Sequence, residues 1–123
     1  MIKISESEWQ IMQILWKEPY LTLGEIKKRL DGTKVLDKTT INTMLRRLKK
    51  KEAIGVEEAR YSKYYPLVSE DQCLEGEMTS ILERMFYKSP KKLVATLVKQ
   101  ESFTQDDIDE IKALLRDIEG KND

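Results

Sequence analysis

Residues 37–51, DKTTINTMLRRLKKK, place hydroxyl and amide side chains ahead of a cluster of cations. Between Lys38 and Lys51 there are six Lys or Arg residues and no acid. In a helix, which turns about 100° per residue, the apolar residues of this segment fall on one arc. The opposite arc and its flanks then carry the polar residues Thr39, Thr40, Asn42, Thr43, Arg46, Arg47 and Lys50. Such a helix would present hydrogen-bonding groups at its first end and positive charge at its last.

This layout suits the major groove of double-stranded DNA. Thr and Asn side chains at the start of a helix can bond to base edges, where sequence is read. Arg and Lys at the far end can neutralise phosphates. The alternative interpretation is a solvated helix end whose cations complement the dipole of their own helix.

Helix-start signals predict two further helices ahead of this segment. Residues 5–8 (SESE) and 22–25 (TLGE) both fit a capping box. The first helix then carries apolar residues at helical spacing, which are Trp9, Ile11, Met12, Ile14, Leu15 and Trp16. The second ends at Asp31-Gly32, and Asp37 caps the third. Three helices joined by short turns predict a helix-turn-helix arrangement.

A β-hairpin is predicted after the third helix. Two β-prone runs, residues 54–56 and 61–65, flank the polar tip EEAR, and Pro66 marks the edge or end of the second strand. Arg60 and Lys63 would then be wing contacts to a phosphate or to the minor groove, or else ordinary surface charges. A helical triad followed by a hairpin is a winged helix-turn-helix domain, which we predict for residues 1–68.

Residues 69–123 are predicted to form a helical dimerisation region, which makes the fold mainly α with a small β-hairpin. Ser69, Ser89 and Thr104 cap three amphipathic helices, and Pro90 takes the first helical position after Ser89. These helices contain few aromatic residues with which to form a core of their own, so we expect a partner chain to cover their apolar faces. The expected interface residues are Leu74, Met78, Ile81, Met85, Ile108, Ile111, Leu115 and Ile118. The last four have the 3-4-3 spacing of two packed helices.

The composition favours a binding protein over an enzyme, and it predicts neither a cofactor nor a metal site. The chain has no histidine, and its one cysteine, Cys73, is interpreted as a small core residue rather than as a redox thiol. An acidic cluster at residues 106–110 could hold a hard cation, but a helix N-terminus also favours negative charge. Residues 1–68 carry a net charge of +5 and residues 69–123 carry −5, so the first half suits an anionic partner.

The sequence gives no sign of a membrane or an export signal. No apolar run approaches the roughly 20 residues that a membrane-spanning helix requires. The first residues, MIKISESEW, lack the apolar stretch of a signal peptide. We therefore expect a cytoplasmic protein.

Four stretches resemble the penicillinase-repressor family of winged-helix transcriptional repressors. They are ISESEWQIMQILW, LTLGEIKKRL, KTTINTMLRRLKKKEAIGVE and YYPLVSED, and the resemblance covers essentially residues 4–72. The family includes repressors of β-lactamase and methicillin-resistance genes and the copper-responsive CopY repressors. The resemblance implies a homodimer that binds a palindromic DNA operator, with base contacts at Thr39, Thr40, Asn42 and Thr43. It also implies DNA-binding roles for Arg47, Lys50 and Lys51.

Two regulatory features of that family are absent. Thr96-Leu97 stands where the β-lactam-responsive members have the Asn-Phe bond that is cleaved, which speaks against a regulatory protease as a partner. The chain ends in LLRDIEGKND, without the paired Cys-x-Cys motifs of the copper-responsive members. The leading hypothesis is a homodimeric DNA-binding repressor. The competing hypotheses are a winged-helix protein-interaction module and a family member that responds to another signal, such as metal or drug stress.

Overall fold

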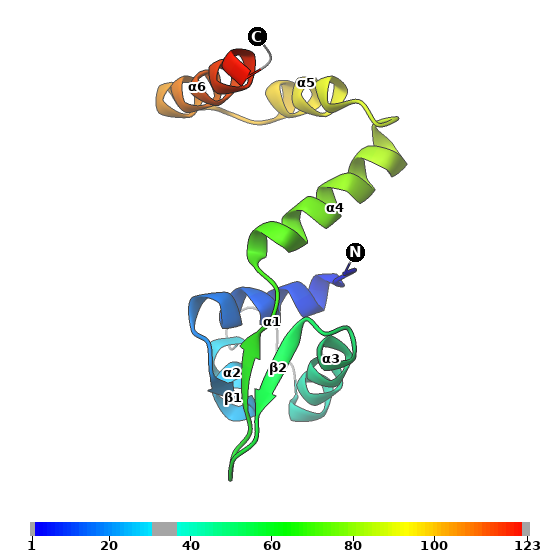
Figure 1. Ribbon diagram of the computed structural model, residues 1–123, viewed down its shortest axis with the longest axis vertical. Coiled ribbons are helices and arrows are strands. Elements are labelled where there is room, and N and C mark those ends of the chain that lie inside the picture. Colours follow the sequence, from blue (N-terminus) through cyan, green and yellow to red (C-terminus); the bar gives the residue numbers. More distant parts are fainter. Residues whose placement is uncertain (1, 31–36, 122–123) are drawn as a thin grey trace. The chain divides into compact units, whose positions relative to one another are not determined.

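The computed structural model describes residues 2–30 and 37–121, and these are mainly helical (Figure 1). The elements follow in the order α1 (Glu6–Lys17), β1 (Leu21–Thr22), α2 (Leu23–Leu30), α3 (Lys38–Lys50), β2 (Ile54–Glu57), β3 (Lys63–Pro66), α4 (Glu70–Met85), α5 (Pro90–Gln100) and α6 (Gln105–Lys121). They divide into two compact units, residues 1–80 and 81–123. The predicted fold class is confirmed. The expected end of the second helix at Asp31-Gly32 lies outside the described residues.

The predicted hairpin is part of a small antiparallel sheet. In the part of the chain that the structure describes, the strand order is β1-β3-β2. β2 and β3 form the hairpin, but β3 runs from Lys63 to Pro66 instead of from Tyr61 to Tyr65, because residues 58–62 form the turn. The sequence did not predict β1. Its two residues are too few for a periodic pattern, and only their pairing with β3 makes them a strand.

Local hydrogen bonds begin the helices at the predicted caps. The Ser5 N–H donates to Glu8 Oε1 (2.9 Å), and the Glu8 N–H donates to Ser5 Oγ (3.3 Å). The same reciprocal pairs form at the starts of α2 and α4. Caps also form at the predicted residues ahead of α5 and α6. These bonds satisfy backbone donors that have no partner inside the helix.

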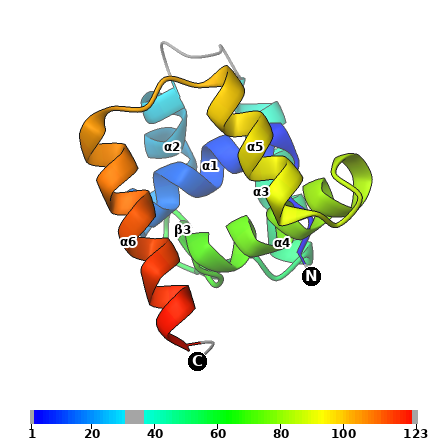
Figure 2. The same cartoon turned by 90° about the horizontal axis from the view of Figure 1, so that it is seen from above.

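The hydrophobic core of the first unit joins α1, α2 and α3 to the start of β2. In the view of Figure 2, α1 has α2 and α3 beside it, and both contact it. Each fully buried aliphatic side chain contributes roughly 1.5–3 kcal/mol. The apolar residues with the lowest exposure are Ile11, Met12, Leu15, Ile26, Ile41, Leu45, Leu48, Ala53 and Ile54. This core holds α3 by one side only.

Two tryptophans of α1 are partly buried at the margin of the core. The rings of Trp9 and Trp16 meet edge to face, with centroids 5.5 Å apart. Trp16 Nε1–H donates to the carbonyl oxygen of Val68 at 2.9 Å. That bond ties α1 to the segment between β3 and α4, 52 residues away.

Helix α4 starts in the first unit, and the boundary between the two units falls inside it, after residue 80. Cys73 and Gly76 are its buried residues. Cys73 belongs to the hydrophobic core of the first unit, as the core interpretation expected, and burial raises the pKa of its thiol. A high thiol pKa leaves little of the reactive thiolate.

Helices α5 and α6 of the second unit bury none of their described residues. Many large apolar side chains of this part of the chain are exposed, namely Met85, Val94, Leu97, Val98, Ile111, Leu114, Leu115 and Ile118. Leu74 and Met78, earlier on α4, are exposed as well. Exposed apolar surfaces of this extent usually mark sites where another molecule binds.

Helix α3 ends in a turn with a left-handed residue that is not glycine. Glu52 has a φ of 62°. Its N–H donates to the Lys49 carbonyl (3.0 Å), and the Ala53 N–H donates to the Leu48 carbonyl (2.9 Å). The turn satisfies the last carbonyls of α3 and leads directly into β2, although a residue with a Cβ is strained at this φ.

Replacing Glu52 by Gly should raise the free energy of unfolding by about 0.5–1 kcal/mol, because Gly adopts this conformation without a Cβ clash. Urea unfolding followed by circular dichroism would measure the change. Glu52→Ala is the matched control, since it removes the same charge and keeps the Cβ. Equal gains in the two variants would assign the effect to charge and contradict the strain.

Candidate nucleic-acid interface

Helix α3 exposes the face that its sequence predicted. Its apolar arc, Ile41, Met44, Leu45 and Leu48, is only 0–5% exposed. The polar side is exposed at Thr39, Thr40, Asn42, Arg46, Arg47, Lys49 and Lys50. Thr43 is half-buried, and its hydroxyl donates to the carbonyl oxygen of Thr39 at 3.0 Å. The predicted residues therefore share one accessible side of a firmly packed helix.

The first turn of α3 is held by an aspartate cap. Asp37 Oδ1 accepts the backbone N–H of Thr40 at 2.7 Å. This bond lowers the pKa of Asp37, with a smaller contribution from the charge of Lys27. The cap fixes the turn that carries Thr39 and Thr40.

The cations at the end of α3 differ in their surroundings. Arg46, Arg47, Lys49 and Lys50 are exposed and form no ion pair with a described residue. The Lys51 ammonium instead lies 2.6 Å from Glu8 Oε1. The structure thus separates Lys51 from the other predicted DNA-binding cations.

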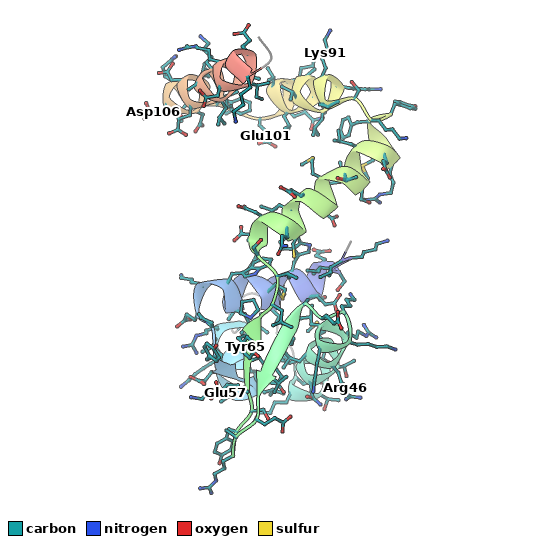
Figure 3. All side chains as sticks on the ribbon, in the orientation of Figure 1. Arg46, Glu57, Tyr65, Lys91, Glu101 and Asp106 are labelled. Atoms are coloured by element: carbon teal, nitrogen blue, oxygen red, sulfur yellow. The ribbon has the colours of Figure 1, made fainter. Side chains whose placement is uncertain are left out.

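The wing carries the two predicted cations near its tip. The Arg60 guanidinium lies 5.8 Å from the centre of the Tyr61 ring, and that ring is 68% exposed. Lys63 is exposed at the start of β3. Figure 3 shows Arg46 on α3 and Glu57 on the hairpin, and the tip of the hairpin projects beyond α3. The wing and α3 therefore offer positive groups from two separate elements.

A small cavity of about 150 Å³ lies between α3 and the wing. Asn42, Arg46 and Lys49 line it from α3, and Val56, Glu58, Ser62 and Tyr64 line it from the hairpin and its turn. The sequence did not identify Glu58. It predicted EEAR as the tip of the hairpin, but it could not show that Glu58 lines a cavity beside α3. Glu58 therefore adds a negative charge to a cavity that Arg46 and Lys49 of α3 also line.

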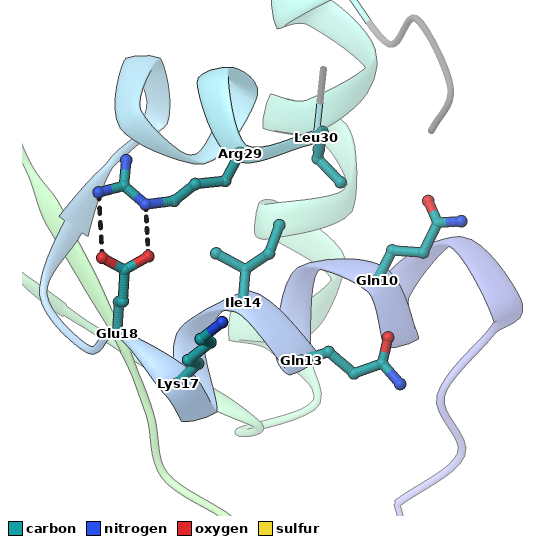
Figure 4. A pocket seen from close by; sticks show the side chains of 7 residues that line it. All are labelled: Gln10, Gln13, Ile14, Lys17, Glu18, Arg29 and Leu30. Carbon is teal, nitrogen blue, oxygen red and sulfur yellow. Dashed lines mark hydrogen bonds and ion pairs between the residues drawn. The ribbon is translucent and has the colours of Figure 1, made fainter. Parts of the chain in front are cut away.

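A second cavity, of about 400 Å³, lies between α1 and α2 (Figure 4). Across it the Arg29 guanidinium donates to both carboxylate oxygens of Glu18, at 2.6 and 3.1 Å. The bond from Arg29 lowers the pKa of Glu18. This bidentate pair joins the end of α1 to α2.

The described residues show no alternative metal or membrane site. The acids Asp106, Asp107, Asp109 and Glu110 lie exposed in the first part of α6, and no described group of three such ligands could hold a metal ion. Asp107 instead accepts the N–H of Thr104 at 3.1 Å, as part of the cap. None of the described helices combines the length and apolarity that spanning a membrane requires.

Three helices, an antiparallel hairpin and an exposed basic third helix define a winged-helix protein. The chain belongs to the penicillinase repressor family, whose sequence profile matches residues 4–117. The DNA-binding domain of the repressor BlaI has a TM-score of 0.51 and 36% identity, over 56% of this chain and 85% of that one. A solution structure of monomeric Bacillus licheniformis BlaI with the blaP half-operator has a TM-score of 0.50 and 36% identity, over 58% and 89%.

Full-length relatives agree with this assignment. The penicillinase repressor of Bacillus licheniformis is 28% identical over 116 residues, which are 94% of this chain and 91% of the relative. The methicillin resistance regulatory protein MecI of Staphylococcus aureus strain N315 is 28% identical over 114 residues, 92% and 93% of the two chains. MepR, a transcription regulator of a Staphylococcus aureus efflux pump, shares the fold at 21% identity and a TM-score of 0.54.

Acid should weaken the cap of α3. Because the folded-state pKa of Asp37 is lowered, its stabilisation is complete above its ordinary value of 3.8 and is lost as the pH falls through the lower folded value. Asp37→Asn keeps a capping oxygen that does not titrate. Urea midpoints should therefore shift in favour of the Asn variant as the pH falls from about 7 to about 3.

Asp37→Ala is the control for this comparison, because it removes the cap at both pH values and should be the least stable variant at neutral pH. A difference between wild type and Asp37→Asn that does not change with pH would contradict the role of the ionised carboxylate.

Proposed function

We propose that the protein is a DNA-binding transcriptional repressor that acts in the cytoplasm as a homodimer on a palindromic operator, without catalytic activity. The observation that carries the proposal is the exposed polar and basic face of α3, opposite a fully buried apolar arc. Membership of the penicillinase repressor family supports it. The likeness to a domain solved in complex with its half-operator supports it as well.

The two ends of α3 take different parts in DNA binding. Inserted into the major groove, its first turns bring Thr39, Thr40, Asn42 and Thr43 to base edges. Arg46, Arg47 and Lys50 reach phosphates, and each neutralised phosphate makes binding more sensitive to salt. Arg60 and Lys63 extend the contact from the wing to the backbone or the minor groove. Sequence reading and phosphate neutralisation therefore lie on different residues.

Dimerisation explains the uncovered apolar side chains of α4, α5 and α6. The proposed interface consists of Leu74, Met78, Ile81, Met85, Ile108, Ile111, Leu115 and Ile118. Most of them are exposed, and Ile81 and Ile108 are half-buried. Burying them against a second copy would supply the core that α5 and α6 lack. A two-fold dimer would place its two α3 helices in half-sites about one helical turn apart, or a near multiple.

We propose that the release of repression differs from the Asn-Phe cleavage of the β-lactam-responsive relatives, because Thr96-Leu97 stands at the matching position. The matching bond, Thr96–Leu97, lies within α5, and the Thr96 hydroxyl donates to the Lys92 carbonyl at 2.8 Å. Without the Asn-Phe pair, this bond lacks the residues at which those relatives are cleaved. We propose that another signal controls this protein.

Arg47→Ala and Asn42→Ala should weaken DNA binding in distinguishable ways. Arg47→Ala should weaken binding to all duplexes alike and reduce the slope of log affinity against log salt by about 1. Asn42→Ala should cost about 1–3 kcal/mol on the operator alone, and so narrow the gap between operator and random DNA. Fluorescence anisotropy at several salt concentrations would measure both.

Lys99→Ala on α5 is the control for an exposed lysine outside α3. Identical behaviour of the Arg47 and Asn42 variants would refute the division of roles. If the wild-type protein shows no salt-dependent binding to any duplex, the proposed function fails, and a winged-helix protein-interaction module becomes the better hypothesis.

Replacing Ile111 and Leu115 by Asp should give monomers with much weaker operator affinity, because two charges would enter the proposed interface. Sedimentation velocity would report the change of mass. Ala113→Asp is the matched control, since residue 113 is exposed on the opposite side of α6 from residues 111 and 115. An unchanged dimer in the double variant would place the interface elsewhere.

A further inference from the structure

The first unit contains a buried carboxylate beneath the end of α3. Glu8 is only 1% exposed, although it lies in the first turn of α1. Its Oε1 accepts the Ser5 N–H at 2.9 Å and the Lys51 ammonium at 2.6 Å. Its Oε2 is buried and has no hydrogen-bond partner among the described residues. A charge this deeply buried depends on its partner, because removing the partner leaves it uncompensated.

Lys51 connects this carboxylate to the junction between α3 and β2. It is the C-cap residue of α3, and its N–H donates to the Arg47 carbonyl at 3.0 Å. The residues that follow are the left-handed Glu52 and the buried Ala53, which lead into β2. The ion pair therefore links the start of α1 to the point where the third helix becomes the wing, across 43 residues of sequence.

We propose that Lys51 is a positioning residue, which fixes the C-terminal end of α3 and the start of the wing relative to α1 through its ion pair with Glu8. Lys51 then sets the angle at which the polar face of α3 meets the bases, instead of neutralising a phosphate. This inference rests on the proposed function, since it concerns how α3 is presented to DNA.

The end of α3 needs a directional contact with α1, because the other residues that pack between these two helices are apolar. Leu48 of α3 and Ile11 and Met12 of α1 are fully buried in the same core. Apolar packing is non-directional, whereas the Lys51 ammonium has to meet one buried carboxylate oxygen. Registry is the best-attested use of a buried ionic contact.

The neighbouring lysine provides the contrast. Both lysines are exposed, but Lys50 forms no ion pair with a described residue, whereas the Lys51 ammonium contacts Glu8 while 34% of the Lys51 side chain remains accessible. The two residues are adjacent and carry the same charge. Lys50→Met and Lys51→Met therefore remove the same charge from neighbouring positions with different surroundings.

The test uses the full-length protein and two DNA probes, a duplex selected by the wild-type protein from a random-sequence pool and a mixed-sequence duplex. Binding is measured at several salt concentrations, at a temperature where circular dichroism shows every variant folded. Lys50→Met should weaken binding to both probes and reduce the salt slope by about 1. Lys51→Met should keep the slope and lower the affinity ratio of selected to mixed duplex by about tenfold.

Two further variants separate positioning from stability. Glu8→Gln should also lower the ratio, although loss of a negative charge would by itself strengthen binding to every duplex. The double variant Glu8→Gln/Lys51→Met should regain thermal stability relative to Lys51→Met, because no buried charge is left unpaired, while its ratio stays low. Lys51→Arg, which can still pair with Glu8, should restore the ratio.

The positioning role is overturned if Lys51→Met reduces the salt slope as Lys50→Met does and Glu8→Gln leaves the ratio unchanged. It is also overturned if the double variant regains the full ratio together with its stability, since Lys51 would then act on stability alone. If the wild-type protein binds neither probe, the proposed function fails and this role fails with it. Wild-type binding together with either of the first two outcomes rejects the positioning role alone.

Discussion

The burial of one arc of α3 is the constraint on which the rest of the domain depends. Ile41, Met44, Leu45 and Leu48 pack against α1 and α2, and because side chains three and four residues apart share a face, the opposite side has to be exposed. The same packing makes α3 rigid enough to present hydroxyl, amide and cationic groups in a fixed order. Caps at both ends support this arrangement, one from Asp37 and one through the turn at Glu52.

The two units of the chain differ in how far they bury their apolar side chains. The first unit closes a core of its own and surrounds it with hydrogen bonds and ion pairs that join distant segments, such as Trp16 with Val68 and Arg29 with Glu18. In the second unit, α5 and α6 bury none of their described residues. The proposed dimeric repressor would need both parts, a winged helix to read one half-site and a region that a second chain covers.

The distribution of charge along the chain also fits the proposed binding to DNA. The chain is neutral overall, but its first 68 residues carry +5 and the remainder −5. Positive charge therefore concentrates on residues 1–68, which contain the winged helix that we propose to meet DNA, and the acidic remainder would be repelled by phosphates. Within the first unit, Glu58 beside the α3 cations and Glu8 beneath Lys51 moderate that positive charge.

The sequence by itself determined the features that depend on near neighbours. The capping boxes join residues three apart, and the apolar arc of α3 follows from helical geometry, so the helices, the hairpin and the exposed face of α3 could all be predicted. Tertiary structure alone decided the contacts between distant segments. They include the strand β1, the acid facing α3 from the wing, and the pairing of Lys51 with Glu8. Lys49, Lys50 and Lys51 look alike in the sequence, because only the folded chain decides which of them meets a buried carboxylate.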